Sequence, residues 1–428
     1  MTFTIKSNKS DIFDVAIIGG GPAGMIAAGK AGEVGAKVIL LEKNARLGRK
    51  LLITGNGRCN LTQAEFNVRE MVEKFGENGK FLFSSLTRFG VKEIIGFFNS
   101  RGCKTKIERG DRVFPESDNA QDVLDILIRY MAENGVTVSC GSEVTSLEKE
   151  ENRITRLMTN KNEIIAKNYV LCTGGKSFPG TGSTGDGFKW AEKLGHHVTE
   201  LTPSLTALNI KEDWVKSLQG LSLKNVEISV FQNDVKKESI FGEMLFTHFG
   251  ISGPIILSIS KNVGNLLKKG KVTLSLDLKP ALDFTKLDKR IQRDFLKYQN
   301  KNYKNSLDEL LPQNLIPIII DLSGIDPDKQ VNSITKEERH RLVNLLKGLN
   351  VTVTSIQGFE HSLITNGGIA IKEIDPKTMR SKLIENLFFA GEIIDVDGPT
   401  GGYNLQVCWS TGYIAGENAA ISIKEPIK

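Results

Sequence analysis

The sequence predicts a mixed α/β fold in which a parallel sheet built from both ends of the chain is interrupted by a β-rich domain and a small helical insert. Three observations predict it. A glycine-rich turn joins an apolar strand to a helix within residues 14–42. A second strand, glycine loop and helix follow at 386–420. Between them the pattern changes to short β segments and then to helical spacing.

Length and composition exclude several classes of protein. The chain has 428 residues, of which 40% are hydrophobic and 25% are charged, as in ordinary globular domains. No apolar run reaches the ~18 residues of a membrane-spanning helix, and residues 1–13 lack the apolar core of a signal peptide. We therefore expect a cytoplasmic protein without membrane contact. The five cysteines form no C-x-x-C pair, and no residues have metal-ligand spacing, so no metal site is expected.

The turn after the first strand carries the strongest local signal. Residues 14–18 form an apolar strand, and the turn Gly19-Gly20-Gly21-Pro22-Ala23-Gly24 that follows fits G-x-G-x-x-G at the start of a helix. Gly19 permits the tight turn, Gly21 lets a pyrophosphate approach the backbone, and Gly24 lets the helix pack on the strand. The helix N-terminus then attracts the phosphates.

The strand at 37–42 completes a βαβ unit and ends in an acid. Glu42 lies 18 residues past Gly24, where a carboxylate would accept hydrogen bonds from an adenosine ribose. A dinucleotide site is therefore predicted, and up to this point NAD and FAD both satisfy the pattern.

Three later segments favour FAD. Thr173-Gly174-Gly175 ends a strand with a bend that can pass beside a nucleotide without interference from side chains. Gly391-Glu392 ends another, and its acid suits the ribityl hydroxyls of a flavin. Gly402-Tyr403-Asn404 opens the helix at 404–420, whose N-terminus suits the N1–O2 edge of a reduced flavin.

A second glycine pattern needs a separate interpretation. Gly180-Thr-Gly182-Ser-Thr-Gly185 also fits G-x-G-x-x-G and precedes a helix at 186–194. It does not directly follow a strand, and no strand-terminal acid lies at the required distance. We assign it to the same domain as a loop near the active centre. NAD(P)H, as the expected electron donor, would then bind only transiently.

The central part of the chain has an uneven charge distribution. Residues 261–304 contain twelve Lys or Arg against four Asp, a local net charge of +8 within a total of +6. A solvated helical face explains this, and so does a contact with RNA or another anionic partner.

These motifs resemble those of the BaiN/YhiN-like family of bacterial FAD-dependent oxidoreductases, also described as aminoacetone oxidase-like. The segments that carry the resemblance are 54–62, 181–187, 245–254, 390–392 and 398–406. Asn56 stands where the family usually has Gly, and Gln63 where it usually has Asn. The resemblance implies an FAD-binding Rossmann-like domain at 1–195 and 366–428, a barrel-like domain at 196–275 and 348–365, and a basic helical insert at 276–347.

The resemblance also adds site residues. It implies that Arg49, Arg58, Cys59 and Asn60 lie along the pyrophosphate and flavin, and that Val144 pairs its backbone with the adenine. Cys59 has no partner spaced for a redox disulfide, so we interpret it as structural lining. The predicted cofactor-binding residues are Gly19, Gly21, Pro22, Ala23, Gly24, Glu42, Lys43, Arg49, Gly57, Arg58, Cys59, Asn60, Val144, Thr173, Gly174, Gly175, Gly391, Glu392, Gly402, Tyr403, Asn404 and Leu405.

The expected activity is reduction of the bound FAD by NAD(P)H, followed by hydride transfer from flavin N5 to an activated C=C bond. The resemblance implies steroid-like acids, an rRNA pyrimidine or amines as substrates. An amine oxidase that passes electrons to O₂, an RNA-associated flavoprotein and a purely structural flavoprotein remain as alternatives. His248 is a candidate proton donor, and a histidine that only holds its loop explains it equally well.

Overall fold

The computed structural model describes residues 12–423, and within them the chain divides into two compact units. The sheet unit comprises Met1–Pro203 and Ser362–Lys428, and the barrel unit comprises Ser204–His361. The chain therefore passes from one unit to the other at 203/204 and 361/362, whereas the sequence predicted 195/196 and 365/366. Strands β11 (Thr202–Ser204) and β18 (Ile364–Asn366) pair with each other near these two points.

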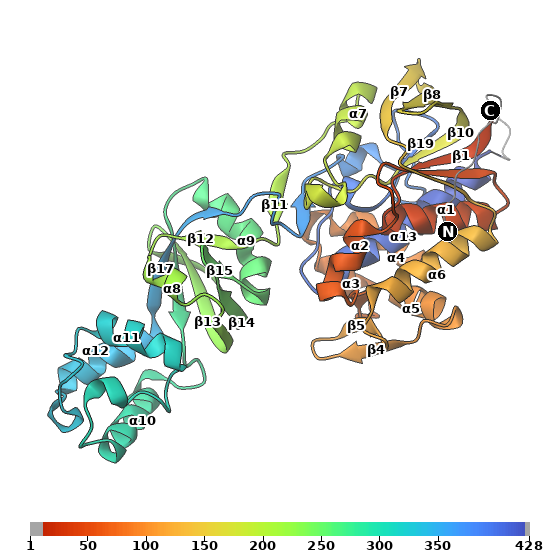
Figure 1. The fold of residues 1–428 in the computed structure, drawn as a ribbon. Helices are drawn as coiled ribbons and strands as arrows, with labels where there is room; N and C mark the ends of the chain where they lie inside the picture. Colours follow the sequence, from red (N-terminus) through yellow and green to blue (C-terminus); the bar gives the residue numbers. More distant parts are fainter. Residues whose placement is uncertain (1–11, 424–428) are drawn as a thin grey trace. The chain divides into compact units, whose positions relative to one another are not determined.

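The sheet unit is built on five parallel strands in the order β19-β10-β1-β2-β6 (Figure 1). Strands from the N-terminal part of the chain therefore pair with one from the C-terminal part, as the sequence predicted. The strands are β1 (Phe13–Ile18), β2 (Val38–Glu42), β6 (Thr137–Cys140), β10 (Ala166–Leu171) and β19 (Leu387–Phe389).

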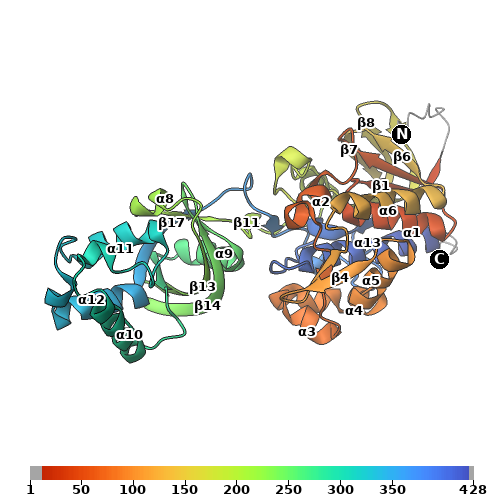
Figure 2. The same cartoon turned by 60° about the horizontal axis from the view of Figure 1, so that its bottom comes forward.

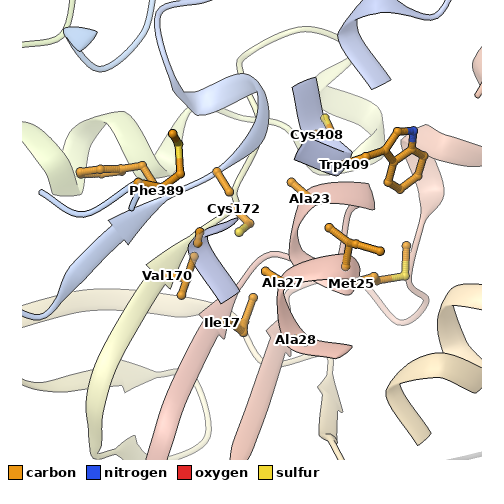
Figure 3. Packing of buried hydrophobic residues seen from close by; sticks show 14 of the residues in the cluster. Ile17, Ala23, Met25, Ala27, Ala28, Val170, Cys172, Phe389, Cys408 and Trp409 are labelled. Carbon is orange, nitrogen blue, oxygen red and sulfur yellow. The ribbon is translucent and has the colours of Figure 1, made fainter. Parts of the chain in front are cut away.

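Two helices, α1 (Pro22–Glu33) and α13 (Tyr403–Ile421), pack on this sheet and on each other, and a third, α6 (Ala120–Glu133), packs on α1. Helix α1 is buried over most of its length because it packs against both α13 and α6. Figure 3 shows the result: small side chains of α1 such as Ala23 and Ala27 lie beside Ile17 and Val170 of the sheet and near Trp409 of α13.

The remaining parts of the sheet unit are excursions from this framework. Residues 43–119 contribute short helices and the three-stranded sheet β3-β5-β4, and a second three-stranded sheet, β7-β8-β9, precedes β10. Their elements are α2 (Arg49–Ile53), β3 (Thr62–Gln63), α3 (Val68–Glu73), α4 (Phe83–Arg88), α5 (Val91–Ser100), β4 (Thr105–Glu108), β5 (Arg112–Pro115), β7 (Val144–Glu150), β8 (Arg153–Thr159), β9 (Glu163–Ile164) and α7 (Asp186–Leu194).

The barrel unit is a closed barrel with strand order β12-β15-β14-β13-β16-β17, accompanied by helices (Figure 2). The strands are β12 (Leu208–Ile210), β13 (Ser222–Gln232), β14 (Val235–Phe246), β15 (Gly250–Ser252), β16 (Val272–Asp277) and β17 (Leu349–Ile356). The helices are α8 (Trp214–Ser217), α9 (Pro254–Leu267), α10 (Phe284–Lys297), α11 (Ile316–Ser323) and α12 (Lys336–Lys347). The predicted helical insert shares one apolar core with the barrel, because Leu287 and Leu342 belong to the same buried cluster as Leu276 and Leu349.

Short 3-10 turns complete the chain and several of them border the site described next. They are η1 (Thr54–Gly57), η2 (Gly76–Leu82), η3 (Pro179–Thr181), η4 (Tyr303–Asn305), η5 (Gln313–Leu315), η6 (Val331–Ser333), η7 (Ile371–Glu373) and η8 (Gly391–Ile393). No helix within residues 12–423 is long and apolar enough to cross a membrane.

Candidate cofactor-binding site

The glycine turn between β1 and α1 combines close packing with one open position. A Cβ on Gly24 would lie 1.8 Å from the Gly19 carbonyl oxygen, so this helix can approach the strand only through glycine. A Cβ on Gly21 would meet no atom of residues 12–423 within 4 Å. Over the same residues, no side chain caps the N-terminus of α1. Its first turn therefore presents backbone N–H groups next to open space, which suits a phosphate.

That space is part of a cleft along the carboxyl edge of the sheet. The segments that follow β1, β2, β6, β10 and β19 all contribute to its walls. Ligands of doubly wound folds bind at this edge. The sequence-predicted residues that line the cleft are Gly19, Gly21, Pro22, Ala23, Glu42, Lys43, Arg49, Val144, Thr173, Gly174, Glu392, Asn404 and Leu405.

Glu42 is the last residue of β2 and lines the cleft at the β2 end of the sheet. Its Oε2 accepts a hydrogen bond from the Gly20 N–H (2.7 Å), and its Oε1 accepts one from the Asn44 N–H (2.8 Å). Val144, which comes after β6, lines the cleft at the same end, because β6 is the neighbour of β2 in the sheet. The predicted ribose acceptor is thus held against the glycine turn by backbone hydrogen bonds.

The second glycine pattern forms a wall of the same cleft. Lys43 Nζ lies 2.7 Å from Asp186 Oδ2, at the start of α7, and also donates to the Thr184 hydroxyl. Burial would raise the pKa of Asp186, but hydrogen bonds from Lys43 and Thr184 outweigh it and lower the pKa. Residues 181–184 of this loop therefore border the cleft beside Lys43.

Arg49 supplies a cation that is free to meet an anionic ligand. Its Nη1 donates to Asn44 Oδ1 (2.8 Å), and it has no carboxylate partner among residues 12–423. The preceding residue, Gly48, donates its N–H to the Gly20 carbonyl oxygen (3.0 Å), which ties α2 to the glycine turn. A guanidinium at this position suits the oxygens of a pyrophosphate.

The other end of the cleft is formed after β19 and before α13. Lys50 Nζ lies 2.8 Å from Glu392 Oε2, and the Thr365 N–H donates to Glu392 Oε1 (2.9 Å). Asn404 shapes the loop before α13, because its side chain accepts from the Gly398 N–H (2.9 Å) and donates to the Gly398 carbonyl (2.9 Å). Glu392 and the start of α13 therefore face one part of the cleft.

Thr173 adds a polar group with no protein partner. Its Oγ1 is buried and accepts or donates no hydrogen bond among residues 12–423, although buried polar atoms are normally paired. This hydroxyl faces Gly187 of α7, where a Cβ would lie 2.1 Å from it. The open Gly21, the uncapped start of α1 and Arg49, which has no carboxylate partner among residues 12–423, fit the phosphates of a dinucleotide such as FAD.

Nine predicted residues do not line the cleft: Gly24, Gly57, Arg58, Cys59, Asn60, Gly175, Gly391, Gly402 and Tyr403. Several support its walls from behind. A Cβ on Gly175 would lie 2.4 Å from Thr365 Oγ1, and one on Gly391 would lie 2.7 Å from the Ala23 Cβ. Burial raises the pKa of the Cys59 thiol to about 12, so this cysteine is a protonated part of the core.

Arg58 differs most from its expected place along the pyrophosphate. Its guanidinium forms ion pairs with Glu108 and Asp118 and lies over the Phe114 ring, 4.0 Å from the centroid. Two carboxylates therefore already neutralise this cation, and it braces the loop after η1 against β4 and β5. The sequence gives no local signal that Glu108 and Asp118 lie beside Arg58.

The barrel unit holds the predicted proton donor, His248. It is exposed on the loop between β14 and β15, with its ring against Phe249. Its catalytic role stays a prediction. Sequence reasoning missed other residues that line the cleft, among them Asn44, Lys50, Thr365 and Cys408. Lys50 had a signal, because it follows Arg49 in the same short helix, whereas nothing local shows that residue 365 returns to this edge.

Comparison with known proteins confirms the family expected from the motifs. The model of the HI0933-like protein Rossmann domain matches residues 13–418. The 3-dehydro-bile acid delta(4,6)-reductase of Clostridium scindens is 31% identical over 409 residues, which cover 95% of this chain and 98% of that protein. The ribosomal RNA dihydrouridine synthase of Escherichia coli is also 31% identical, with the same coverage.

Two solved structures of oxidoreductases have a similar fold. The open conformation of a flavocytochrome c3 fumarate reductase is similar with a TM-score of 0.53 and 18% identity, over 96% of this chain and 78% of that one. The 3-ketosteroid-delta4-(5alpha)-dehydrogenase of Rhodococcus jostii has a TM-score of 0.52 and 14% identity, over 97% and 98%. The fold is therefore the Rossmann-type FAD-binding fold. The chain belongs to the HI0933-like Rossmann-domain family, a family of FAD-dependent oxidoreductases.

Proposed function

We propose that this chain is a reductase that binds FAD in the cleft, takes electrons from NAD(P)H and saturates an activated C=C bond of a small molecule or of an rRNA pyrimidine. The observation that carries the proposal is the cleft itself, with an open glycine turn, an unpaired arginine and two acids at its ends. When bound, FAD would supply a hydride from N5 and be restored by a hydride from the nicotinamide.

The strand order suggests how a dinucleotide would lie. Glu42 ends β2, the glycine turn follows β1, Thr173 follows β10 and Glu392 follows β19. Since the acid after the second strand of such a unit binds the adenosine ribose and the helix start binds the pyrophosphate, the flavin part would extend toward β10 and β19. Glu392 and the start of α13 would then face it.

The named relatives support a C=C acceptor. The names delta(4,6)-reductase and dihydrouridine synthase both indicate saturation of a C=C bond. In the reaction proposed for this chain, each C=C bond that is saturated would gain one hydride and one proton, and NAD(P)H would be oxidised to NAD(P)⁺. His248 or water would supply the proton. Both NAD(P)H and rRNA are cytosolic reactants, so we also place this chain in the cytoplasm.

The donor is tested by mixing the FAD-loaded protein anaerobically with NADPH and, separately, with NADH. Loss of the visible flavin bands with either nucleotide, and their return on adding an unsaturated acceptor, are the expected results. Bands that persist with both nucleotides but bleach with a small amine, with peroxide formed on admitting air, would overturn the proposal in favour of an amine oxidase.

We also propose that part of the segment 261–304 contacts RNA. Its acids are engaged by nearby cations: Asp288 lies 2.6 Å from Arg339, and Asp294 lies 2.8 Å from Arg290. Lys289 and Arg293 are exposed on α10 and have no carboxylate partner among residues 12–423. Such a face favours phosphate contacts.

Reversing the charge of this face tests the RNA contact. In the Lys289→Glu/Arg293→Glu variant, binding to an rRNA fragment should weaken, and the salt dependence of log K should flatten by roughly 0.7–0.9 per lost phosphate contact. Lys236→Glu/Lys237→Glu, on the exposed hairpin between β13 and β14, is the charge-matched control. Equal weakening by both pairs would mean that net charge alone, and not this face of α10, attracts the RNA.

A further inference from the structure

In the wall of the cleft, an ion pair joins two parts of the chain that are far apart in sequence. Lys50 belongs to α2 and Glu392 to η8, yet Nζ and Oε2 are 2.8 Å apart. The side chains are only 21% and 17% exposed, so solvent screens their interaction much less than at an open surface. Both residues line the cleft.

The second oxygen of Glu392 is also held. Its Oε1 accepts the N–H of Thr365, and the Thr365 hydroxyl in turn accepts the N–H groups of Lys176 (2.8 Å) and Ser177 (3.1 Å). Thr365 is 2% exposed, so this anchor is part of the core. The carboxylate therefore cannot turn away from the cleft without breaking contacts on both oxygens.

The place of this pair in the sheet order gives it a role. This step rests on the proposed function, in which the adenosine would lie at the β2 end and the redox-active part near the segment after β19. Glu392 belongs to that segment, and the ion pair brings the Lys50 ammonium to it from α2. Adding electrons to a flavin adds negative charge to its ring system, and nearby protein charges change how favourable that is. A lone carboxylate here would oppose reduction, whereas a neutralised carboxylate does not.

We propose that Lys50 is a positioning residue that neutralises Glu392 next to the flavin and thereby sets the reduction potential of the bound cofactor. Glu392 then remains available as a hydrogen-bond acceptor for polar groups of the ligand without the electrostatic penalty of an isolated anion. Neither residue needs to exchange a proton or a bond with the substrate for this role.

The test is the midpoint potential of the bound flavin, measured against a reference dye, with the affinity for FAD determined in parallel. Lys50→Met should shift the two-electron equilibrium toward the oxidised flavin at least tenfold, or about 30 mV. Lys50→Arg, which keeps the charge, should shift it less than threefold. Glu392→Gln should shift it in the opposite direction, and the Lys50→Met/Glu392→Gln double variant should return close to the wild type.

The outcomes separate this inference from the proposed function. A wild-type protein that binds no FAD overturns both. A wild type that binds FAD, with a potential unchanged in Lys50→Met, overturns only the role of Lys50. A potential lowered equally in Lys50→Met and the double variant also overturns it, because a charge effect requires Glu392. If Lys50→Met releases its flavin, Glu392→Gln decides: a raised potential supports the role and an unchanged or lowered one contradicts it.

Discussion

Replacing Gly21 should weaken ligand binding in the cleft without affecting the folding of the protein. Because a Cβ at this position meets no atom of the described residues within 4 Å, Gly21→Val should fold like the wild type. The added methyl groups would occupy the space that a pyrophosphate needs. We expect the affinity for FAD to fall at least about a hundredfold, or ~2.8 kcal/mol, in a fluorescence titration.

A glycine outside the cleft provides the matched control. Gly180 is exposed, does not line the cleft, and a Cβ there also meets open space among the described residues. Gly180→Val should bind FAD like the wild type. A folded Gly21→Val protein that retained full affinity would refute the placement of the phosphates at this turn.

His196 should make the stability of the fold depend on pH. It is buried, and its Nε2 accepts from the Ser381 hydroxyl (2.8 Å), whose oxygen already accepts the N–H groups of Leu383 and Ile384. Burial lowers the pKa of His196, although Glu373 opposes this shift. Below about pH 6.5 the unfolded chain therefore takes up a proton that the folded state resists. The free energy of unfolding then decreases as the pH decreases.

Urea unfolding at several pH values measures this effect. In His196→Gln, whose amide can accept from Ser381, the loss of unfolding free energy between about pH 7 and about pH 5.5 should be smaller than in the wild type. His361→Gln, at an exposed histidine, should leave the pH dependence unchanged. Parallel curves for the wild type and His196→Gln would exclude His196 as the group responsible.

Single residues show both the reach and the limit of sequence reasoning. The positions of Gly19, Gly21 and Gly24 in the turn and of Glu42 at the strand end could be predicted, because they follow from spacing within one βαβ unit. Arg58 could not, because its partners Glu108 and Asp118 come from β4 and from the loop after β5.

At the level of elements, α1 and α13 depend on glycines where they pack together. A Cβ on Gly416 of α13 would lie 2.1 Å from the Ala27 carbonyl oxygen of α1. Gly416→Ala should therefore destabilise the fold by about 1–3 kcal/mol, although alanine normally favours a helix. Chemical unfolding compares it with Gly96→Ala in α5, where a Cβ meets open space among the described residues and stability should rise by roughly 0.5–1 kcal/mol. Equal stabilisation of both variants would contradict the packing described here.

Elements differ in how clearly the sequence predicts them. The strands expected at 14–18 and 37–42 are continuous apolar segments, and the helix expected at 404–420 follows a glycine loop. These bounds agree with β1, β2 and α13 within one residue. Strand β14, with Lys236, Lys237 and Glu238 in its first half, was not predicted, because this half is largely solvent-facing and has no apolar alternation. Its partner β13 and the closure of the barrel supply the missing context.

For the whole molecule, the residues that line the cleft all belong to the sheet unit. The chain leaves and re-enters this unit at β11 and β18, which pair with each other. Replacing residues 205–360 with a short flexible linker should therefore leave a folded protein that binds FAD within about threefold of the full chain, ~0.7 kcal/mol. Cooperative unfolding establishes that the shortened protein is folded. If it is folded but has lost FAD, the barrel unit must contribute to the site.

The most direct test of the central claim is the visible absorption spectrum of the purified full-length protein after incubation with FAD and removal of unbound cofactor. The cleft predicts a yellow protein with flavin bands at one FAD per chain, lost in Gly21→Val and retained in Gly180→Val. A colourless wild-type protein that is folded by circular dichroism would contradict the assignment of this cleft to FAD.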